Sequence, residues 1–319
     1  MNTRQMEYVI AVYEEKSISR AAQRLHISQP SLSQYIRSIE KSLEIELFDR
    51  TVSPIAPTDM GRIYISTAYK MLALENDLMK CIGDQREESV SQLNIGVSAY
   101  LNTGELSSVV AEIHAKYPSL RIYIHELFSV AMDEMIQQGE LDFSISPIKD
   151  SYDTTRFCRD VVSRDRFYIA ASRELLRKWV PELELAEDGD TAPLERFALA
   201  PFLTMDKRSL QTYSSEMAAR QAGFEMNVIL RCRRWQMLLE LVGESAGVSL
   251  LTDRYLMDSV IPPEVVLLRP AEPVPELVGA VSYLRSAYMP KAARSFISCY
   301  KRTVGHSRNM QGFLEKGYL

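Results

Sequence analysis

The first sixty residues space their apolar side chains as helices do. One stripe recurs at i, i+3, i+4 and i+7 through Met6, Val9, Ile10 and Tyr13. A second stripe spans residues 18–25, with Ser17 as a suitable N-cap, and a third spans residues 32–43 after Ser28 and Pro30, which suit an N-cap and a first helical turn. Two short helices joined by a three-residue turn predict a helix-turn-helix.

The polar face of the third helix indicates what this unit binds. Its side chains are short or flexible hydrogen-bonding groups without a carboxylate: Gln29, Ser31, Ser33, Gln34 and Arg37. Such groups suit base edges and phosphates, so we expect a DNA recognition helix. Periodicity alone leaves a second interpretation open, a solvated helical hairpin with ordinary surface charge.

A long helix is expected to follow Thr58, which suits its N-cap. Its apolar positions continue to Ile82 over roughly seven turns, at 3.6 residues per turn. Those expected to pair with another helix are Ile63, Met71, Leu74 and Leu78. A helix of this length is not stable alone, so we expect a partner helix from a second chain; packing on its own chain is the alternative. The polar run 83–89 predicts a hinge.

From residue 93 onward, strands and helices alternate. Strands are expected at 93–97, 120–127 and 141–145, and helices near 106–117 and 131–138. This order predicts a mostly parallel sheet with helices on both faces. A second α/β unit is expected to be inserted, with strands near 166–170, 201–204, 228–230 and 248–251. The chain then returns through a strand at 277–284 and a helix at 292–301. Two such lobes leave a cleft suited to a small ligand.

Composition and charge change this picture in one respect. The chain has 319 residues, 46% hydrophobic and 25% charged, as expected for about two globular domains. A net charge of -5 argues against bulk nucleic-acid binding. Residues 16–41 nevertheless hold the cations Lys16, Arg20, Arg24, Arg37 and Lys41 against Glu40 alone, so the positive charge is local.

Several functional classes find little support. The cysteines Cys81, Cys158, Cys232 and Cys299 form no C-x-x-C pair and are interpreted as reduced, mostly buried thiols. The four histidines lack metal-binding spacing, and we find no catalytic constellation or phosphate-binding glycine loop, so neither an enzyme nor a cofactor is expected. No apolar run could span a membrane, and residues 1–7 lack the apolar core of a secretion signal, so we expect a cytoplasmic protein.

The run from Ser17 to Glu40, SISRAAQRLHISQPSLSQYIRSIE, resembles the DNA-binding motif of LysR-type transcriptional regulators. The continuation LEIELFDR, ending at Arg50, is similar to that family's entry into its wing. By this resemblance Gln29, Pro30, Ser31, Ser33, Gln34 and Arg37 face the major groove of promoter DNA. Ser17, Ser19 and Arg20 lie near phosphates, and Arg50 is the last cation before the wing, whose residues 51–57 depart from the family in carrying none.

The remainder of the chain is similar to the LysR-type effector domain, which has a two-lobed fold like that of periplasmic solute-binding proteins. The landmarks are GELD at residues 139–142 and LVGESAGV at residues 241–248. The resemblance implies an effector site at Ser98, Tyr100, Asn102, Thr103, Ser129, Ser146, Pro147, Phe202 and Thr204. Hydroxyls and helix N-termini suit a carboxylate, although helix capping explains any single serine equally well. The cluster Arg231, Arg233 and Arg234 is interpreted as a solvated surface patch, with assistance to an anionic ligand as the alternative.

The sequence therefore predicts an α/β protein with an all-α N-terminal part, identified as a member of the LysR-type regulators. We expect a winged helix-turn-helix at residues 1–58, a dimerising linker helix and hinge at 59–89, and an effector domain at 90–319. Its lobes would span about 90–162 with 268–305, and about 163–267. Expected partners are promoter DNA, a small effector, RNA polymerase and further copies of the chain, as a dimer or a dimer of dimers. A solute-binding protein and an α/β enzyme with a DNA-binding appendage are the alternatives; the helix-turn-helix disfavours the first and the missing catalytic set the second.

Overall fold

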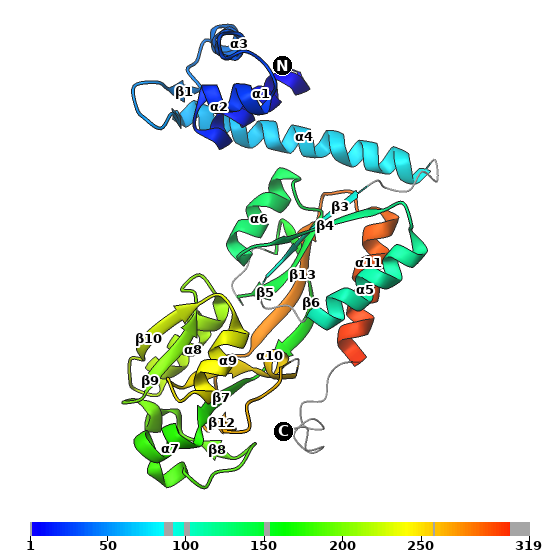
Figure 1. Cartoon of the computed structure of the whole chain (residues 1–319). Helices are drawn as coiled ribbons and strands as arrows, with labels where there is room; N and C mark the ends of the chain where they lie inside the picture. The colour runs from blue at the N-terminus through cyan, green and yellow to red at the C-terminus, as the bar shows by residue number, and fades with distance from the viewer. Residues whose placement is uncertain (1, 86–91, 99–102, 150–153, 258, 307–319) are drawn as a thin grey trace. The chain divides into compact units, whose positions relative to one another are not determined.

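The computed structural model describes residues 2–85, 92–98, 103–149, 154–257 and 259–306 (Figure 1). They form two compact units. The first consists of Met1–Val90 together with Asp133–Asp142 and Ser286–Pro290, and the second consists of the remaining residues. Each unit is described by itself.

The first unit begins with the expected helices. Its elements are α1 (Thr3–Glu15), α2 (Ile18–Arg24), α3 (Gln29–Leu43), β1 (Phe48–Asp49), β2 (Ala56–Pro57) and α4 (Asp59–Gln85). All three predicted caps are confirmed, because Ser17 Oγ accepts the N–H of Arg20 and Ser28 Oγ that of Ser31, while Thr58 Oγ1 accepts that of Gly61 at 2.9 Å. The antiparallel pair of β1 and β2 forms the base of the wing.

The helix-turn-helix packs around the predicted stripes. Its fully buried side chains are Val9, Val12, Ala21, Leu32, Ile36, Leu47 and Ala68, so the first half of α4 packs on its own domain. The stripes end sooner than expected, since Tyr13 and Leu43 are exposed. Gly61 permits the close approach of α4 to the wing, because a Cβ there would lie 1.9 Å from the carbonyl oxygen of Leu47.

The second unit contains a five-stranded sheet, which we call the first lobe. Its strands are β3 (Gln92–Val97), β4 (Arg121–Glu126), β5 (Phe143–Ile148), β6 (Phe157–Asp165) and β13 (Leu277–Leu284), in the order β4-β3-β5-β13-β6. Parallel pairing joins β3 to β4 and β5, as predicted, whereas β13 is antiparallel to β5 and β6. The helices are α5 (Thr103–Lys116) and α11 (Lys291–His306), which pack side by side (Figure 1). Helix α6 (Ser129–Gln138) begins in this unit, and its residues from 133 onward belong to the first unit.

The second lobe is the inserted α/β unit. Its strands are β7 (Phe167–Ser172), β8 (Thr191–Ala192), β9 (Pro201–Met205), β10 (Asn227–Cys232), β11 (Ser249–Thr252) and β12 (Val265–Pro270). Its helices are α7 (Arg173–Trp179), α8 (Leu210–Gln221), α9 (Trp235–Gly243) and α10 (Asp253–Met257), with short 3-10 turns at Pro181–Leu183 and Leu194–Phe197.

The second lobe was predicted only as an inserted α/β unit, and its main sheet is mostly antiparallel. In its main sheet, ordered β11-β7-β12-β8, the strand β7 is antiparallel to both β11 and β12. A parallel arrangement survives in the pair β9 and β10 and between β12 and β8. The antiparallel directions arise from how the chain passes between the lobes. It enters the second lobe where β6 leads into β7, with only Arg166 between them, and it leaves where β12 leads into β13. The strands of these two crossings therefore run in opposite directions.

A buried ion cluster joins the two lobes next to the point where β6 leads into β7. Arg254 of α10 contacts Glu105 of α5 at 2.6 Å and Asp165, the last residue of β6, at 3.1 Å. All three side chains are no more than 7% exposed. Burial alone would lower the pKa of Arg254, but the charges of Asp165 and Glu105 outweigh it and raise that pKa. The guanidinium therefore stays charged.

Candidate functional site

The exposed face of α3 is the first candidate site. Leu32, Ile36 and Ile39 are buried, whereas the opposite side chains are exposed: Gln29, Pro30, Ser31, Gln34 and Arg37. We call these five residues the recognition surface. Ser33 is half-buried beside them, and the surface holds no carboxylate. The helix thus presents donors and acceptors on one side and its apolar stripe on the other, as DNA readout in the major groove requires.

The positive charge around this surface is smaller than the residue count for 16–41 indicated. Arg24 forms an ion pair with Glu14, and Arg20 pairs with Glu15 at 3.7 Å. Both acids lie just before the counted segment, at the end of α1. Arg37 and Lys41 have no ion pair among the described residues.

The other residues expected near DNA are placed around this helix. Ser17 is the half-buried N-cap of α2, and Ser19 is exposed in its first turn. Arg50, at the wing, donates to Glu40 Oε2 at 2.6 Å, so its guanidinium is engaged by α3. The other carboxylate oxygen of Glu40 accepts the N–H of Leu47 at 3.0 Å. Glu40 therefore fixes the wing to the recognition helix.

The long helix α4 carries an unpartnered apolar face. The four residues expected to pair with another chain are all exposed: Ile63, Met71, Leu74 and Leu78. Leu74 and Leu78 are 64% and 60% exposed, values that are unusual for leucine in a folded monomer. The helix therefore buries only one of its faces on its own chain, through contacts such as Tyr69 in the domain core and the ion pair of Lys80 with Asp142, and leaves these four side chains uncovered.

The second candidate site is a cavity of about 230 Å³ between the two lobes, which we call the interlobe cavity. Its charged and hydroxyl residues come from corresponding places in both lobes. Ser98 follows β3 and Glu126 ends β4 in the first lobe, while Asp206 follows β9 and Arg233 follows β10 in the second. The cavity thus lies where the carboxyl ends of two parallel strand pairs face each other, the usual ligand position in α/β proteins.

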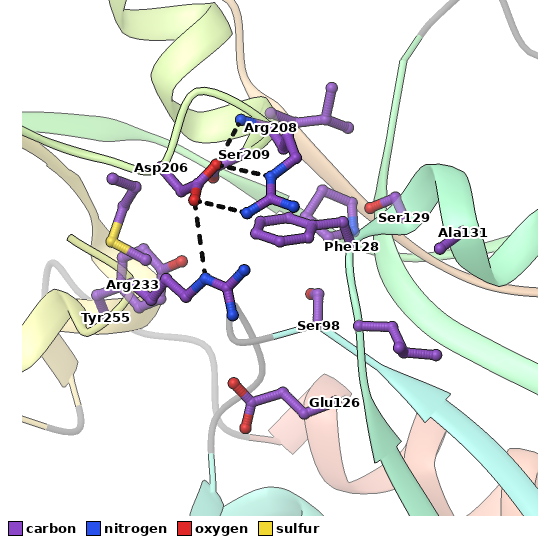
Figure 2. A pocket seen from close by; sticks show the side chains of 14 residues that line it. Ser98, Glu126, Phe128, Ser129, Ala131, Asp206, Arg208, Ser209, Arg233 and Tyr255 are labelled. Atoms are coloured by element: carbon purple, nitrogen blue, oxygen red, sulfur yellow. Dashed lines mark hydrogen bonds and ion pairs between the residues drawn. The ribbon is translucent and has the colours of Figure 1, made fainter. Parts of the chain in front are cut away.

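Two arginines of the second lobe converge on a phenylalanine of the first. The guanidinium carbons of Arg208 and Arg233 lie 4.2 and 5.1 Å from the centre of the Phe128 ring, and both side chains meet Asp206 (Figure 2). Arg208 donates two hydrogen bonds to the Asp206 carboxylate, from Nε to Oδ1 at 3.0 Å and from Nη2 to Oδ2 at 2.9 Å. These hydrogen bonds lower the pKa of Asp206 well below its usual range. Arg233 is held more loosely, with its Nε 3.7 Å from Oδ2.

Several predicted effector residues lie at this cavity, and others do not. Ser98, Ser129 and Pro147 line it. Phe202 is fully buried in the core of the second lobe, and Thr204 is buried while its hydroxyl accepts from Arg231, so neither lines the cavity wall. Ser146 is also buried. Thr103 is the first residue of α5, while Tyr100 and Asn102 lie outside the described residues.

The residues that dominate the cavity were not singled out from the sequence. Phe128, Arg208, Asp206, Glu126 and Tyr255 were missed, and Arg233 was assigned to a solvated patch. Arg233 is exposed, as that interpretation required, but it also lines the cavity, whereas Arg231 pairs with Glu216 at 2.9 Å. The available signal was position, because Glu126, Asp206 and Arg233 each stand at the carboxyl end of a predicted strand.

Other chemistry receives no support from the part of the chain that the structure describes. Within those residues no cluster of His, Cys, Asp or Glu could hold a metal ion, and no helix is long and apolar enough to cross a membrane. The four cysteines are free; Cys299 is buried, while the other three are half-buried rather than mostly buried as expected. Burial raises the pKa of the Cys232 and Cys299 thiols, which opposes formation of reactive thiolates.

Comparison with known proteins gives these two sites a context. Residues 86–305 match the family model of the LysR substrate binding domain, and residues 3–62 match that of the bacterial regulatory helix-turn-helix protein, lysR family. The uncharacterized HTH-type transcriptional regulator YcgK of Bacillus subtilis is 24% identical over 95% of both chains.

Two solved structures show the same fold along nearly the whole length. A full-length OxyR variant from Pseudomonas aeruginosa has a TM-score of 0.68 at 18% identity, covering 95% of this chain and 94% of the other. Full-length CbnR in complex with its target DNA has a TM-score of 0.60 at 18% identity, covering 95% and 100%. Since the substrate-domain model alone matches more than half of the residues, the chain belongs to the LysR family of DNA-binding transcriptional regulators, which are not enzymes.

Proposed function

We propose that this protein binds a specific promoter sequence through the recognition surface of α3 and regulates transcription in response to a small effector bound in the interlobe cavity. The observation that carries the proposal is the exposed, carboxylate-free face of α3 above a fully buried stripe. Gln29, Gln34 and Arg37 supply the flexible donors that read base edges in the major groove. Ser17, Ser19 and Arg20 contact phosphates beside it, and Arg50 approaches the DNA from the wing. The regulator acts in the cytoplasm.

Assembly through α4 completes the DNA-binding unit. One recognition surface with two of its nearby arginines already paired is too weakly charged for tight binding alone. The exposed apolar side chains of α4, including Leu74 and Leu78, support a homodimer through this helix, and a dimer of dimers then presents four surfaces. Tethered surfaces bind adjacent half-sites with far greater avidity than a single one.

Effector binding acts on the angle between the lobes. A ligand in the interlobe cavity contacts residues of both lobes, so it stabilises the arrangement in which both sets of contacts form.

The effect reaches the DNA through three parts of the chain: residues 1–58 for DNA binding, 59–89 for the linker and hinge, and 90–319 for the effector domain. A change in lobe angle alters the spacing of the recognition surfaces, the bending of the promoter and its access for RNA polymerase.

The ligand carries an anionic group on this proposal. The cavity receives two guanidinium groups from the second lobe, and only Arg208 is fully engaged by Asp206. Among the residues that the structure describes, no partner binds the Nη groups of Arg233, which can form charge-assisted hydrogen bonds to a carboxylate. The Ser98 hydroxyl and the start of α6 at Ser129 lie on the same cavity wall.

A gel-shift titration tests the DNA-binding part of the proposal. Wild-type protein and Arg37→Ala are titrated onto DNA from upstream of the protein's own gene at several salt concentrations. Loss of a direct contact is expected to weaken specific binding by about 1–3 kcal/mol. Lys178→Ala is the matched control, because it removes one exposed cation from α7 and leaves α3 unchanged. Absence of a specific complex with every neighbouring promoter, or equal losses in both variants, would contradict the proposal.

A further inference from the structure

The interlobe cavity contains opposite charges that do not pair with each other. Glu126 of β4 and Arg233 after β10 both line it, yet no ion pair joins them, and the Glu126 carboxylate has no hydrogen bond or ion pair among the described residues. Figure 2 shows the two side chains on the same side of Phe128, with Ser98 close by. Opposite charges facing one cavity without contact leave room for a ligand that carries both complementary charges.

A buried hydroxyl lies with these charges. Ser98 Oγ is shielded from solvent and has no hydrogen-bond partner in the described structure. Leaving a buried hydroxyl unpaired costs free energy, because water bound it in the unfolded chain. An acceptor on a ligand in the cavity would restore the missing hydrogen bond. Ser98 therefore supplies evidence of ligand recognition that is independent of the two charges.

The same three residues stand where two cavities meet. Ser98, Glu126 and Arg233 line the interlobe cavity and also a neighbouring groove of about 940 Å³ beside α5. Beyond this junction the interlobe cavity is lined by the mutually paired Asp206 and Arg208, by Ser129 and Ser209, and by a set of apolar or aromatic side chains: Leu127, Phe128, Ala131, Pro147, Met205, Leu210 and Tyr255. Glu126 and Arg233 are thus the charged groups of the junction, and the apolar side chains beside them leave space for the body of a ligand.

We infer that the effector is an amino acid or a close derivative, whose protonated amine binds Glu126 and whose carboxylate binds Arg233 and Ser98 Oγ. This inference rests on the proposed function, since it names the ligand class of the same cavity. The apolar wall around Phe128 and Leu210 receives the side chain. A ligand with an anionic group alone would approach Glu126 as a like charge, and an amine alone would approach Arg208 and Arg233 as one. Only a ligand with both groups places an opposite charge beside Glu126 and beside Arg233.

The experiment measures ligand binding to the full-length protein by thermal shift and then by calorimetry. The first probes are the proteinogenic amino acids and a set of amine-free mono- and dicarboxylates. The amino acid that binds best is then compared with its deaminated and its decarboxylated analogue; for leucine these are 4-methylpentanoate and 3-methylbutylamine. Removal of either charged group is expected to weaken binding about tenfold or more.

Two variants separate the roles of the charges. Glu126→Gln is expected to weaken the amino acid about tenfold while leaving amine-free acids equal or tighter, since it removes a like charge. Arg233→Gln is expected to weaken every carboxylate-bearing probe. Glu174→Gln, an exposed carboxylate on α7 away from the cavity, is the matched control and should change neither affinity.

The outcomes are decisive for the inference and separable from the proposed function. Binding of an amino acid that requires both its amine and Glu126 supports the inference. It is overturned if no amino acid binds, if an amine-free acid binds as tightly, or if Glu126→Gln leaves amino-acid affinity unchanged. A protein that forms a specific DNA complex and responds only to amine-free acids overturns this inference and leaves the proposed function standing. A protein without specific DNA binding overturns the proposed function itself.

Discussion

Replacement of Arg254 by methionine is expected to destabilise the second unit more than any exposed charge deletion. The substitution keeps an unbranched side chain of similar length in the same place but removes the cation between Glu105 and Asp165. Both carboxylates are almost fully buried, at 7% and 6% exposure. They would then face each other in a low-dielectric site with the intervening charge gone.

The expected loss of unfolding free energy depends on the favourable interactions that Glu105 and Asp165 keep once Arg254 is replaced. Removing one partner of a buried ion pair costs about 3–5 kcal/mol, because the remaining charge keeps its desolvation penalty. Asp165 still accepts the Ser163 hydroxyl at 3.0 Å, and Glu105 lies in the first turn of α5, where the helix dipole favours a negative charge. We therefore expect the lower end, about 3 kcal/mol, which corresponds to roughly 6–12 °C in the melting temperature of a unit of this size.

Tryptophan fluorescence during urea unfolding at pH 7 measures this change. The chain has two tryptophans, Trp179 and Trp235, and both lie in the second lobe. The Trp235 ring stacks on Tyr255 at 5.2 Å, next to Arg254 in sequence, so the signal reports on the relevant region. Arg177→Met is the matched control: its ion pair with Glu184 is 68% and 37% exposed, and its loss should cost at most about 1 kcal/mol.

A third variant makes the reasoning refutable. Changing all three members together, Arg254→Met with Glu105→Gln and Asp165→Asn, removes the charges and should recover much of the lost stability. A loss below about 1 kcal/mol for Arg254→Met, or a triple variant less stable than the single one, would refute the electrostatic account.

The raised pKa of Arg254 also sets how the stability contributed by its charge depends on pH. A base contributes stability below its unfolded pKa and loses it as pH rises through the folded value, so its contribution should stay constant from pH 5 to 9.

Three further predictions follow from other parts of the molecule. Gly61→Ala places a Cβ against the Leu47 carbonyl oxygen and is expected to lower the stability of the helix-turn-helix by about 1–3 kcal/mol or more, measured by circular dichroism melting; an unchanged melting temperature would contradict the close contact. Leu74→Asp is expected to dissociate the dimer in analytical ultracentrifugation without unfolding the chain, whereas unfolding of the monomer would favour intrachain burial of α4. Hydrogen bonds from Arg208 lower the pKa of Asp206, and an acid with a lowered pKa loses its contribution only as pH falls through that folded value. Calorimetry between pH 5 and 8 should therefore show no titration of Asp206 on ligand binding; proton uptake by this group in that range would contradict it.

Local patterns account for the parts of the fold that were predicted correctly. The caps at Ser17, Ser28 and Thr58 and the buried stripe of α3 each depend on residues within one helical turn of one another. The parallel strands β3, β4 and β5 also follow, because short βαβ connections restrict how they pair. The strands β6 and β12 were not identified from the sequence, so the strand directions of the second lobe were not predicted. Both lie on the crossings, and their direction depends on the return of a chain segment about a hundred residues away.

The interlobe cavity shows why site residues are harder to predict than strands. Ser98 and Ser129, two of the residues that the family resemblance implied, line its wall, and each comes soon after the end of a strand, a position that one lobe alone defines. Arg233 and Phe128 belong to different lobes and meet only because the two lobes face each other, so no spacing within either lobe encodes that contact. The same fact makes the cavity suitable for regulation. Ligand recognition that depends on groups from both lobes is automatically coupled to the angle between them, whereas a site within one lobe could be filled without moving the other.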